Sequence, residues 1–147
     1  MTDYKEFDFV QYLDENVKDY NGNHNVVIKL LPDLYVLLSS LLASDDLKQI
    51  SRSEIYLTIG YLFYPKDVYP EEIHGPEGFI DDLMLILLIL RRIKDKSDFD
   101  LIEELWTNSY PMKDLLEKDY IELSKEYKDM FEEVLMDTGI IDETYLG

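Results

Sequence analysis

The side chains most able to do chemistry lie in one acidic stretch of the chain. It contains Asp67, His74, Glu77, Asp81 and Asp82. Carboxylate oxygens are the ligands that Mg²⁺ and Ca²⁺ prefer, and a bound metal ion would make hydrolysis the natural chemistry. The spacing matches neither an EF-hand loop nor a zinc signature. The stretch therefore predicts, at most, a carboxylate site for Mg²⁺ or Ca²⁺.

The same aspartates also have a structural interpretation, which we favour. Asp67 follows Pro65 and can cap that turn, while Asp81 and Asp82 fall in the first turn of a predicted helix. Negative charge is favourable there because it faces the positive end of the helix dipole. One of the pair would also reach back to loop amides near Val68 or Tyr69. On this interpretation the three aspartates stabilise the fold, and the protein needs no metal or other cofactor.

Other catalytic constellations are weak. The chain has no cysteine, which excludes thiolate catalysis and cysteine-based zinc sites and suits a reducing cytoplasm. Its two histidines, His24 and His74, have no nucleophile at a suggestive spacing. We therefore name no catalytic residue and expect a protein that is not an enzyme.

The acidic stretch lies between two predicted helices. The first begins at a capping-box pattern, Ser51-x-x-Glu54, and is stopped by Pro65. The second spans about 79–94 and contains eight consecutive apolar residues, 83–90. A helix that is apolar around its whole circumference must be buried on all sides. The sequence thus predicts a central buried helix that follows the acidic loop.

The remaining segments also have helical periodicity. We expect helices over 3–18, over about 25–43 with a start or kink at Pro32, over 97–107, and over a long final stretch, 112–137, that ends at Gly139. Residues 44–46 are expected to form a turn or to cap a short helical turn that runs through Ile50. The predicted fold is all-α. It is a compact single-domain helical bundle, 1–147, of about five to six helices around the helix at 79–94.

Apolar residues on the final helix alternate four and three apart, as in a heptad repeat. They are Leu116, Tyr120, Leu123, Tyr127, Met130 and Val134. About three heptads is short for a free coiled coil. The stripe is expected to pack on the bundle, and the alternative is a partner face that forms the seam of a homodimer.

The net charge of −18 is unevenly distributed. Residues 97–147 carry a net charge of −11, whereas residues 26–96 carry −3. An acidic surface repels phosphate backbones and anionic lipid, so nucleic-acid binding is excluded and peripheral membrane contact is disfavoured. No signal peptide or transmembrane segment is visible, and we expect a cytoplasmic protein. The acidic extension could serve solubility or bind a basic protein partner.

Part of the chain resembles a known family. That part contains the run Gly60-Tyr61-Leu62-Phe63-Tyr64-Pro65, then Asp67 and Pro70, then Gly78-Phe79-Ile80-Asp81-Asp82 before an aliphatic helix. This pattern is similar to that of the YkvA-like family of small helical domains. The resemblance covers about residues 28–96. It implies a helical hairpin and brings no established activity. The chain departs from the pattern at Glu71-Glu72, where the loop looks longer and more acidic.

These observations lead to one expected function and two alternatives. We expect an interaction or scaffold module with an acidic C-terminal face, formed by the extension 97–147. The first alternative is a divalent-metal carboxylate site in the loop 67–82 that supports hydrolysis. The weaker alternative is peripheral membrane association through the aliphatic helices.

Overall fold

The centre of the molecule is the helix formed by the apolar run. The computed structural model describes residues 9–22, 24–62, 79–95 and 99–139. Helix α6 (Ile80–Ile93) buries every residue except Arg91 and Arg92. Each buried Leu or Ile contributes about 1.5–3 kcal/mol, so α6 contributes more to the core than any other described helix. The prediction of a central buried helix is confirmed.

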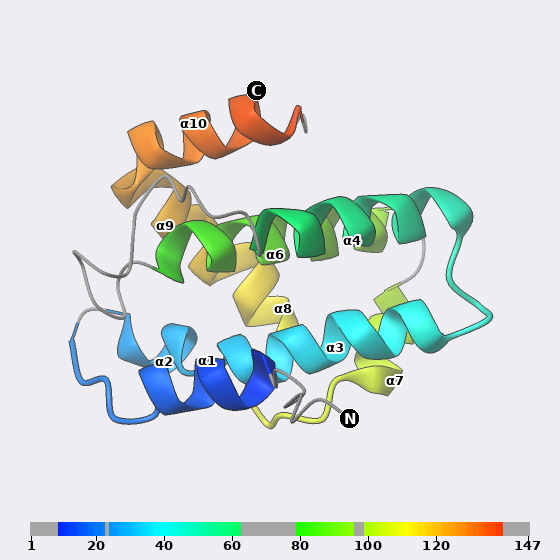
Figure 1. Cartoon of the computed structure of the whole chain (residues 1–147), viewed down its shortest axis with the longest axis horizontal. Coiled ribbons are helices and arrows are strands. Elements are labelled where there is room, and N and C mark those ends of the chain that lie inside the picture. The colour runs from blue at the N-terminus through cyan, green and yellow to red at the C-terminus, as the bar shows by residue number, and fades with distance from the viewer. Residues whose placement is uncertain (1–8, 23, 63–78, 96–98, 140–147) are drawn as a thin grey trace, which may run out of the picture.

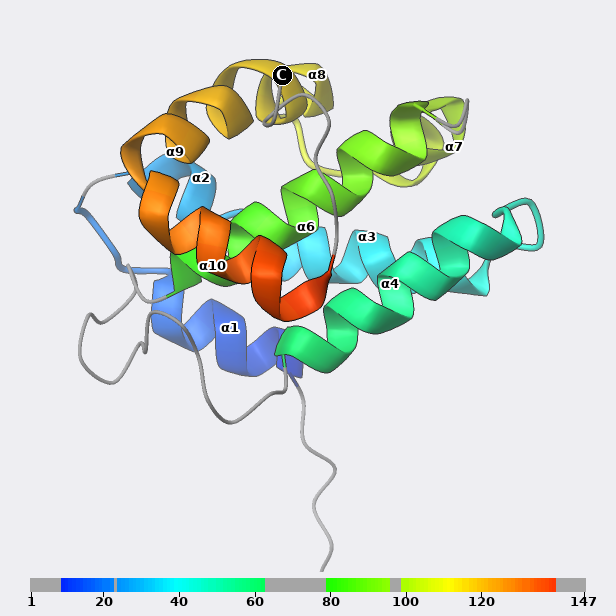
Figure 2. The same cartoon turned by 90° about the horizontal axis from the view of Figure 1, so that it is seen from above.

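The other helices surround α6 (Figures 1 and 2). In the described part of the chain all regular secondary structure is helical, which confirms the all-α class. The N-terminal helices are α1 (Phe9–Val17), α2 (Asn25–Ile28), α3 (Leu31–Ala43) and α4 (Gln49–Leu62). After α6 come α7 (Phe99–Leu105), α8 (Met112–Asp114), the π-helical turn η3 (Leu115–Asp119), α9 (Tyr120–Glu126) and α10 (Lys128–Thr138). Among the described helices, none is long and apolar enough to cross a membrane.

The predicted helix over 25–43 is divided into α2 and α3. Pro32 is the second residue of α3, where its missing N–H costs nothing because first-turn amides have no partner within the helix. α3 packs against α1, α4 and α7. The predicted helix over 3–18 is described only from Phe9, so its proposed start lies outside the described residues.

Helix α4 begins at Gln49, two residues before the Ser51 that the capping-box pattern predicts as its cap. Ser51 is fully buried inside the helix, so the prediction that Ser51 caps it is wrong. The start of α4 is instead held by Arg52. Its guanidinium donates hydrogen bonds to the carbonyl oxygens of Leu42 and Ser44, where α3 ends.

The prediction of one long final helix over 112–137 is also wrong. The π-helical turn η3 and a break at Tyr127 (φ −110°, ψ 40°) divide it into α8, α9 and α10. Figure 2 shows these segments curving around α6, and η3, α9 and α10 all contact it. One straight helix could not follow that curve. The predicted end at Gly139 is confirmed, and this residue has the left-handed conformation (φ 72°) that glycine tolerates.

The heptad-like stripe faces the interior of the same chain. Five of its side chains are buried and Tyr127 is half-buried; the buried five are Leu116, Tyr120, Leu123, Met130 and Val134. Tyr120 packs edge-on against Phe131, and the Arg91 guanidinium lies 4.4 Å from the centre of the Tyr120 ring. A homodimer seam built from this stripe would require the C-terminal helices to move away from α6.

Candidate functional site

The predicted site residues are only partly within the described structure. Asp67, His74 and Glu77 lie outside it. Asp81 and Asp82 are the second and third residues of α6, in its first turn as predicted. Their exposed fractions are 0% and 4%. Both carboxyl groups are therefore withdrawn from solvent at the positive end of the central helix dipole.

Asp81 connects the start of α6 to the end of α4. The Tyr61 hydroxyl donates a hydrogen bond to Asp81 Oδ2 at 3.2 Å. The backbone N–H of Asp82 donates to Asp81 Oδ1 at 3.0 Å. A buried carboxylate is costly unless donors surround it, and these two donors supply part of that compensation. The arrangement holds the two helices together at this end.

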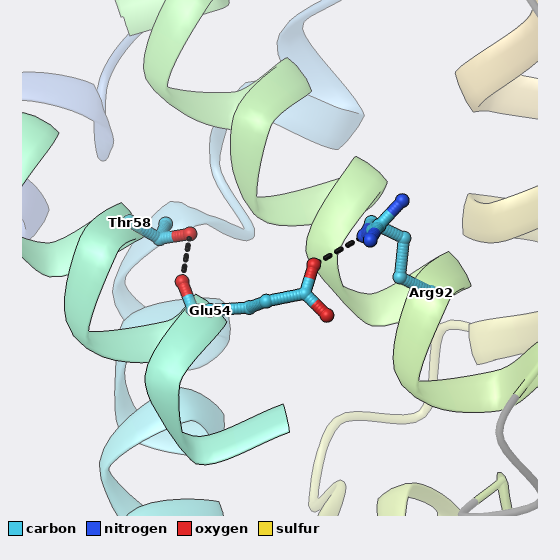
Figure 3. Close-up of polar contacts among 3 residues, drawn as sticks. All are labelled: Glu54, Thr58 and Arg92. Carbon is cyan, nitrogen blue, oxygen red and sulfur yellow. Dashed lines mark hydrogen bonds and ion pairs between the residues drawn. The ribbon is translucent and has the colours of Figure 1, made fainter. Parts of the chain in front are cut away.

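A second polar contact joins the same helices at their other end. The Arg92 guanidinium of α6 forms a hydrogen-bonded ion pair with the Glu54 carboxylate of α4, which extends across the gap between them (Figure 3). The Glu54 side chain is 12% exposed and that of Arg92 is 32% exposed. The buried Thr58 hydroxyl donates to the Glu54 carbonyl oxygen at 3.0 Å (Figure 3). The antiparallel pair α4–α6 is thus connected by polar side chains at both ends.

A third polar network involves Asp33, Asn108, Tyr110 and Asp119. Asn108 donates to Asp33 at 2.7 Å and accepts a hydrogen bond from the backbone N–H of Tyr110 at 2.8 Å. The Tyr110 hydroxyl donates to the buried Asp119 carboxylate of η3 at 2.6 Å. Burial, followed by the hydrogen bond to Asp119 and then the negative charge of Asp119, raises the pKa of Tyr110 above its usual range. The network connects α3, the loop before α8, and η3.

These polar groups do not assemble into a recognisable catalytic centre. Within the described residues, no three His, Cys, Asp or Glu side chains lie close enough together to hold a metal ion. Four of the side-chain contacts join different parts of the fold: Tyr61–Asp81, Glu54–Arg92, Asn108–Asp33 and Tyr110–Asp119. The described contacts of the α4–α6 pair fasten the two helices to each other, and we call this pair the structural framework.

The exposed surface of the C-terminal helices is strongly acidic. Among the side chains that the structure describes over 99–139, the exposed charged ones are ten carboxylates and four ammonium groups. They are Asp100, Glu103, Glu104, Asp114, Glu117, Glu122, Glu126, Asp129, Glu132 and Glu133, with Lys113, Lys118, Lys125 and Lys128. Glu117 pairs with Lys94 at 3.1 Å, which lowers the pKa of that carboxyl group, and Glu126 pairs with His24. The excess of carboxylates lies on α7, α9 and α10, whereas α8 and η3 each expose one carboxylate and one lysine.

Comparison with known proteins identifies the family to which the chain belongs. The model of a family described as "Protein of unknown function (DUF1232)" matches residues 51–88, which comprise most of α4 and the first part of α6. "Uncharacterized protein ORF9" of Methanothermobacter thermautotrophicus is 35% identical over 113 residues, which cover 77% of each chain. No solved structure matches. The chain belongs to this DUF1232 family of proteins of unknown function.

The matched segment coincides with the structural framework. It contains Glu54, Tyr61 and Asp81, three of the four side chains that join α4 to α6, and Arg92 follows its end by four residues. It also lies within the stretch 28–96 that resembles the YkvA-like family, which is consistent with that resemblance. The acidic helices α7 to α10 lie outside the match.

Proposed function

We propose that this protein is a non-enzymatic interaction module whose acidic C-terminal surface binds a basic protein partner. The observation that carries the proposal is the ratio of ten exposed carboxylates to four exposed lysines over α7 to α10. Surface charge of one sign attracts a partner of the opposite sign and accelerates its association.

The outer face of α10 is the part of this surface best suited to a partner helix. Asp129, Glu132, Glu133 and Met136 follow one another at helical spacing, and Met136 is 82% exposed. The opposite side of α10 is anchored in the core by Met130, Phe131 and Val134. Carboxylates pair with Lys and Arg heads, while a flexible thioether packs against their aliphatic stems. We call these four exposed residues the acidic face of α10.

The test uses a variant in which the acidic face of α10 is reversed in charge, and a control variant of the same net charge. A lysine-rich amphipathic helical peptide is titrated calorimetrically into the whole chain and into the triple variant Asp129→Lys, Glu132→Lys, Glu133→Lys. Three lost charge pairs, each contributing about 0.5–1 kcal/mol, should weaken binding by at least about tenfold. Affinity for the unmodified chain should fall as salt is added, because salt screens exposed charges.

The matched control reverses three exposed acids elsewhere, Asp14→Lys, Asp19→Lys and Asp46→Lys. This variant has the same net charge and should retain the peptide affinity of the unmodified chain. Equal losses in both variants would mean that only total charge matters, as expected if the acidity serves solubility alone. Absence of peptide binding to the unmodified chain at low salt would refute the proposal.

A second candidate function rests on Asp81 and Asp82. Two almost fully buried carboxylates on consecutive residues need strong compensation, and a divalent cation would supply it and provide a centre for hydrolysis. Thermal melts with and without Mg²⁺, Ca²⁺ and Mn²⁺ test this, with Asp82→Asn as the comparison. A metal-dependent increase in Tm that Asp82→Asn abolishes would support the cation site. Identical melts of the unmodified chain in all conditions would exclude it.

A further inference from the structure

A charge-free surface is present on this otherwise acidic molecule. At the exposed positions described in α3 and α4, every side chain is uncharged; the residues are Val36, Ser39, Ala43, Gln49, Ile50, Ser53, Tyr56, Leu57 and Gly60. The whole chain has a net charge of −18, and the exposed faces of α7, α9 and α10 are mainly acidic. Exposed apolar residues that gather on one helix mark a contact surface.

On α4 these residues have a regular arrangement. Ser53 and Gly60 are seven residues apart and lie in the middle of the exposed side, with Tyr56 on one flank and Ile50 and Leu57 on the other. A Cβ atom added at Gly60 would meet nothing within 4 Å. Helix α4 lies on the outside of the bundle, with α6 behind it (Figure 1). We call these five residues the α4 outer face.

We propose that a second copy of this chain covers the α4 outer face, through antiparallel packing of two α4 helices about a two-fold axis. A two-fold contact requires a surface that complements itself. With the axis passing midway between Ser53 and Leu57, Ile50 of one copy meets Gly60 of the other, and Ser53 meets Leu57. Each pair combines a large side chain with a small one, so that the two helices can approach closely.

Charge favours a second copy over other occupants. Two molecules that each carry −18 repel least when they meet through a surface without carboxylates. A basic partner would find no carboxylate on the α4 outer face to pair with, and an anionic lipid surface is repelled by the whole molecule. A single helix pair is at the low end of the interface size range, so the dimer is weak, with Kd on the order of 10–100 μM.

Salt dependence distinguishes this contact from binding at the acidic face. Sedimentation equilibrium of the whole chain, from about 10 to about 500 μM, should show the apparent mass rising from monomer towards dimer. The rise should be greater at about 0.5 M salt than at about 0.05 M, because screening reduces repulsion between the copies. A basic partner at the acidic face would show the opposite dependence. A chain that is monomeric throughout this range overturns the proposal.

A matched pair of variants locates the contact. Ile50→Glu and Val26→Glu each replace the second residue of a helix, and the two side chains are 57% and 55% exposed. Ile50→Glu should weaken dimerisation by at least about tenfold because it places like charges in the interface. Val26→Glu should leave it unchanged. Equal behaviour of the two variants would contradict the proposed contact.

Gly60→Leu separates loss of the contact from loss of the fold. Leucine is a better helix former than glycine, its Cβ atom meets nothing within 4 Å and the position is exposed, so Tm should be unchanged or raised while dimerisation is lost. Persistent dimerisation of this variant would overturn the proposed register. Flotation of the unmodified chain with neutral phosphatidylcholine vesicles tests the alternative occupant. Co-flotation that Ile50→Glu abolishes, in a chain that stays monomeric in solution, would assign the face to a lipid surface and overturn the proposal.

Discussion

Breaking the ion pair between Glu54 and Arg92 should destabilise the fold, and the two single substitutions should have unequal costs. Arg92→Met keeps the aliphatic stem but removes the cation from a carboxylate that is only 12% exposed. Glu54→Gln keeps an acceptor and leaves behind a guanidinium that is 32% exposed and can still reach water. We expect Arg92→Met to cost about 2–3 kcal/mol and Glu54→Gln about 1 kcal/mol.

The coupling between the two residues is measured with a double-mutant cycle. Urea unfolding followed by far-ultraviolet circular dichroism gives the free energy of unfolding of each variant. The double variant should be less destabilised than the sum of the single variants by about 1–2 kcal/mol. In a chain of this size each kcal/mol corresponds to about 2–4 °C in Tm. The same cycle on the exposed pair Lys94–Glu117 should show no measurable coupling, because solvent screens it.

Two outcomes would refute this reasoning. Additive costs at positions 54 and 92 would mean that the pair does not hold α4 against α6. A larger cost for Glu54→Gln than for Arg92→Met would mean that the burial of the remaining group does not control the penalty.

Three further substitutions test individual contacts. Tyr61→Phe removes the hydroxyl that donates to the fully buried Asp81, and it should lower the free energy of unfolding by about 1.5–3 kcal/mol in urea, whereas an unchanged urea midpoint would show that this bond adds no stability. The pKa of Tyr110 is higher in the folded chain than in the unfolded chain. The contribution of Tyr110 to the free energy of unfolding is therefore intact below pH about 10 and is lost at higher pH, where Tyr110 ionises first in the unfolded chain. Tyr110→Phe, compared by urea midpoints across that range, should therefore lose less stability at alkaline pH than the unmodified chain, and identical pH profiles would contradict this. Gly139→Ala forces alanine into the left-handed conformation and should cost about 1 kcal/mol, whereas an unchanged Tm would show that the end of α10 relaxes.

The central helix could be predicted from sequence because its burial on all sides can be recognised from consecutive residues. Residues 83–90 leave no polar side for solvent, so only a surrounded helix is compatible with them. The placement of Asp81 and Asp82 in the first turn of that helix followed from the same boundary. Local patterns of this kind do not depend on which other segments pack nearby.

No pattern in the sequence indicated which distant residues contact one another. Ser51 and Glu54 match a capping box, but Ser51 is buried and the Glu54 carboxylate pairs with Arg92, which is 38 residues away. The packing of α4 on α6 decides these partners, and it cannot be inferred from spacing within either helix.

The C-terminal bend shows the same limit. The spacing of Leu116 to Val134 identified residues that the structure buries, yet it predicted a straight helix. The π-helical turn accompanies a contact with Arg91, whose guanidinium donates to the Leu116 carbonyl oxygen. A donor on another helix thus bonds a backbone carbonyl within the turn, and a heptad pattern contains no information about it.

The most direct test of the proposed function is to map the peptide contact by NMR. The whole ¹⁵N-labelled chain is titrated with the lysine-rich amphipathic peptide, and the backbone amide shifts are followed residue by residue. We predict that the largest chemical-shift changes fall on α10 around Asp129, Glu132 and Glu133. The amides of α4 and those near Asp81 should keep their chemical shifts. Changes centred on α4 or on the start of α6, or none at saturating peptide, would contradict an acidic C-terminal surface that binds a basic partner.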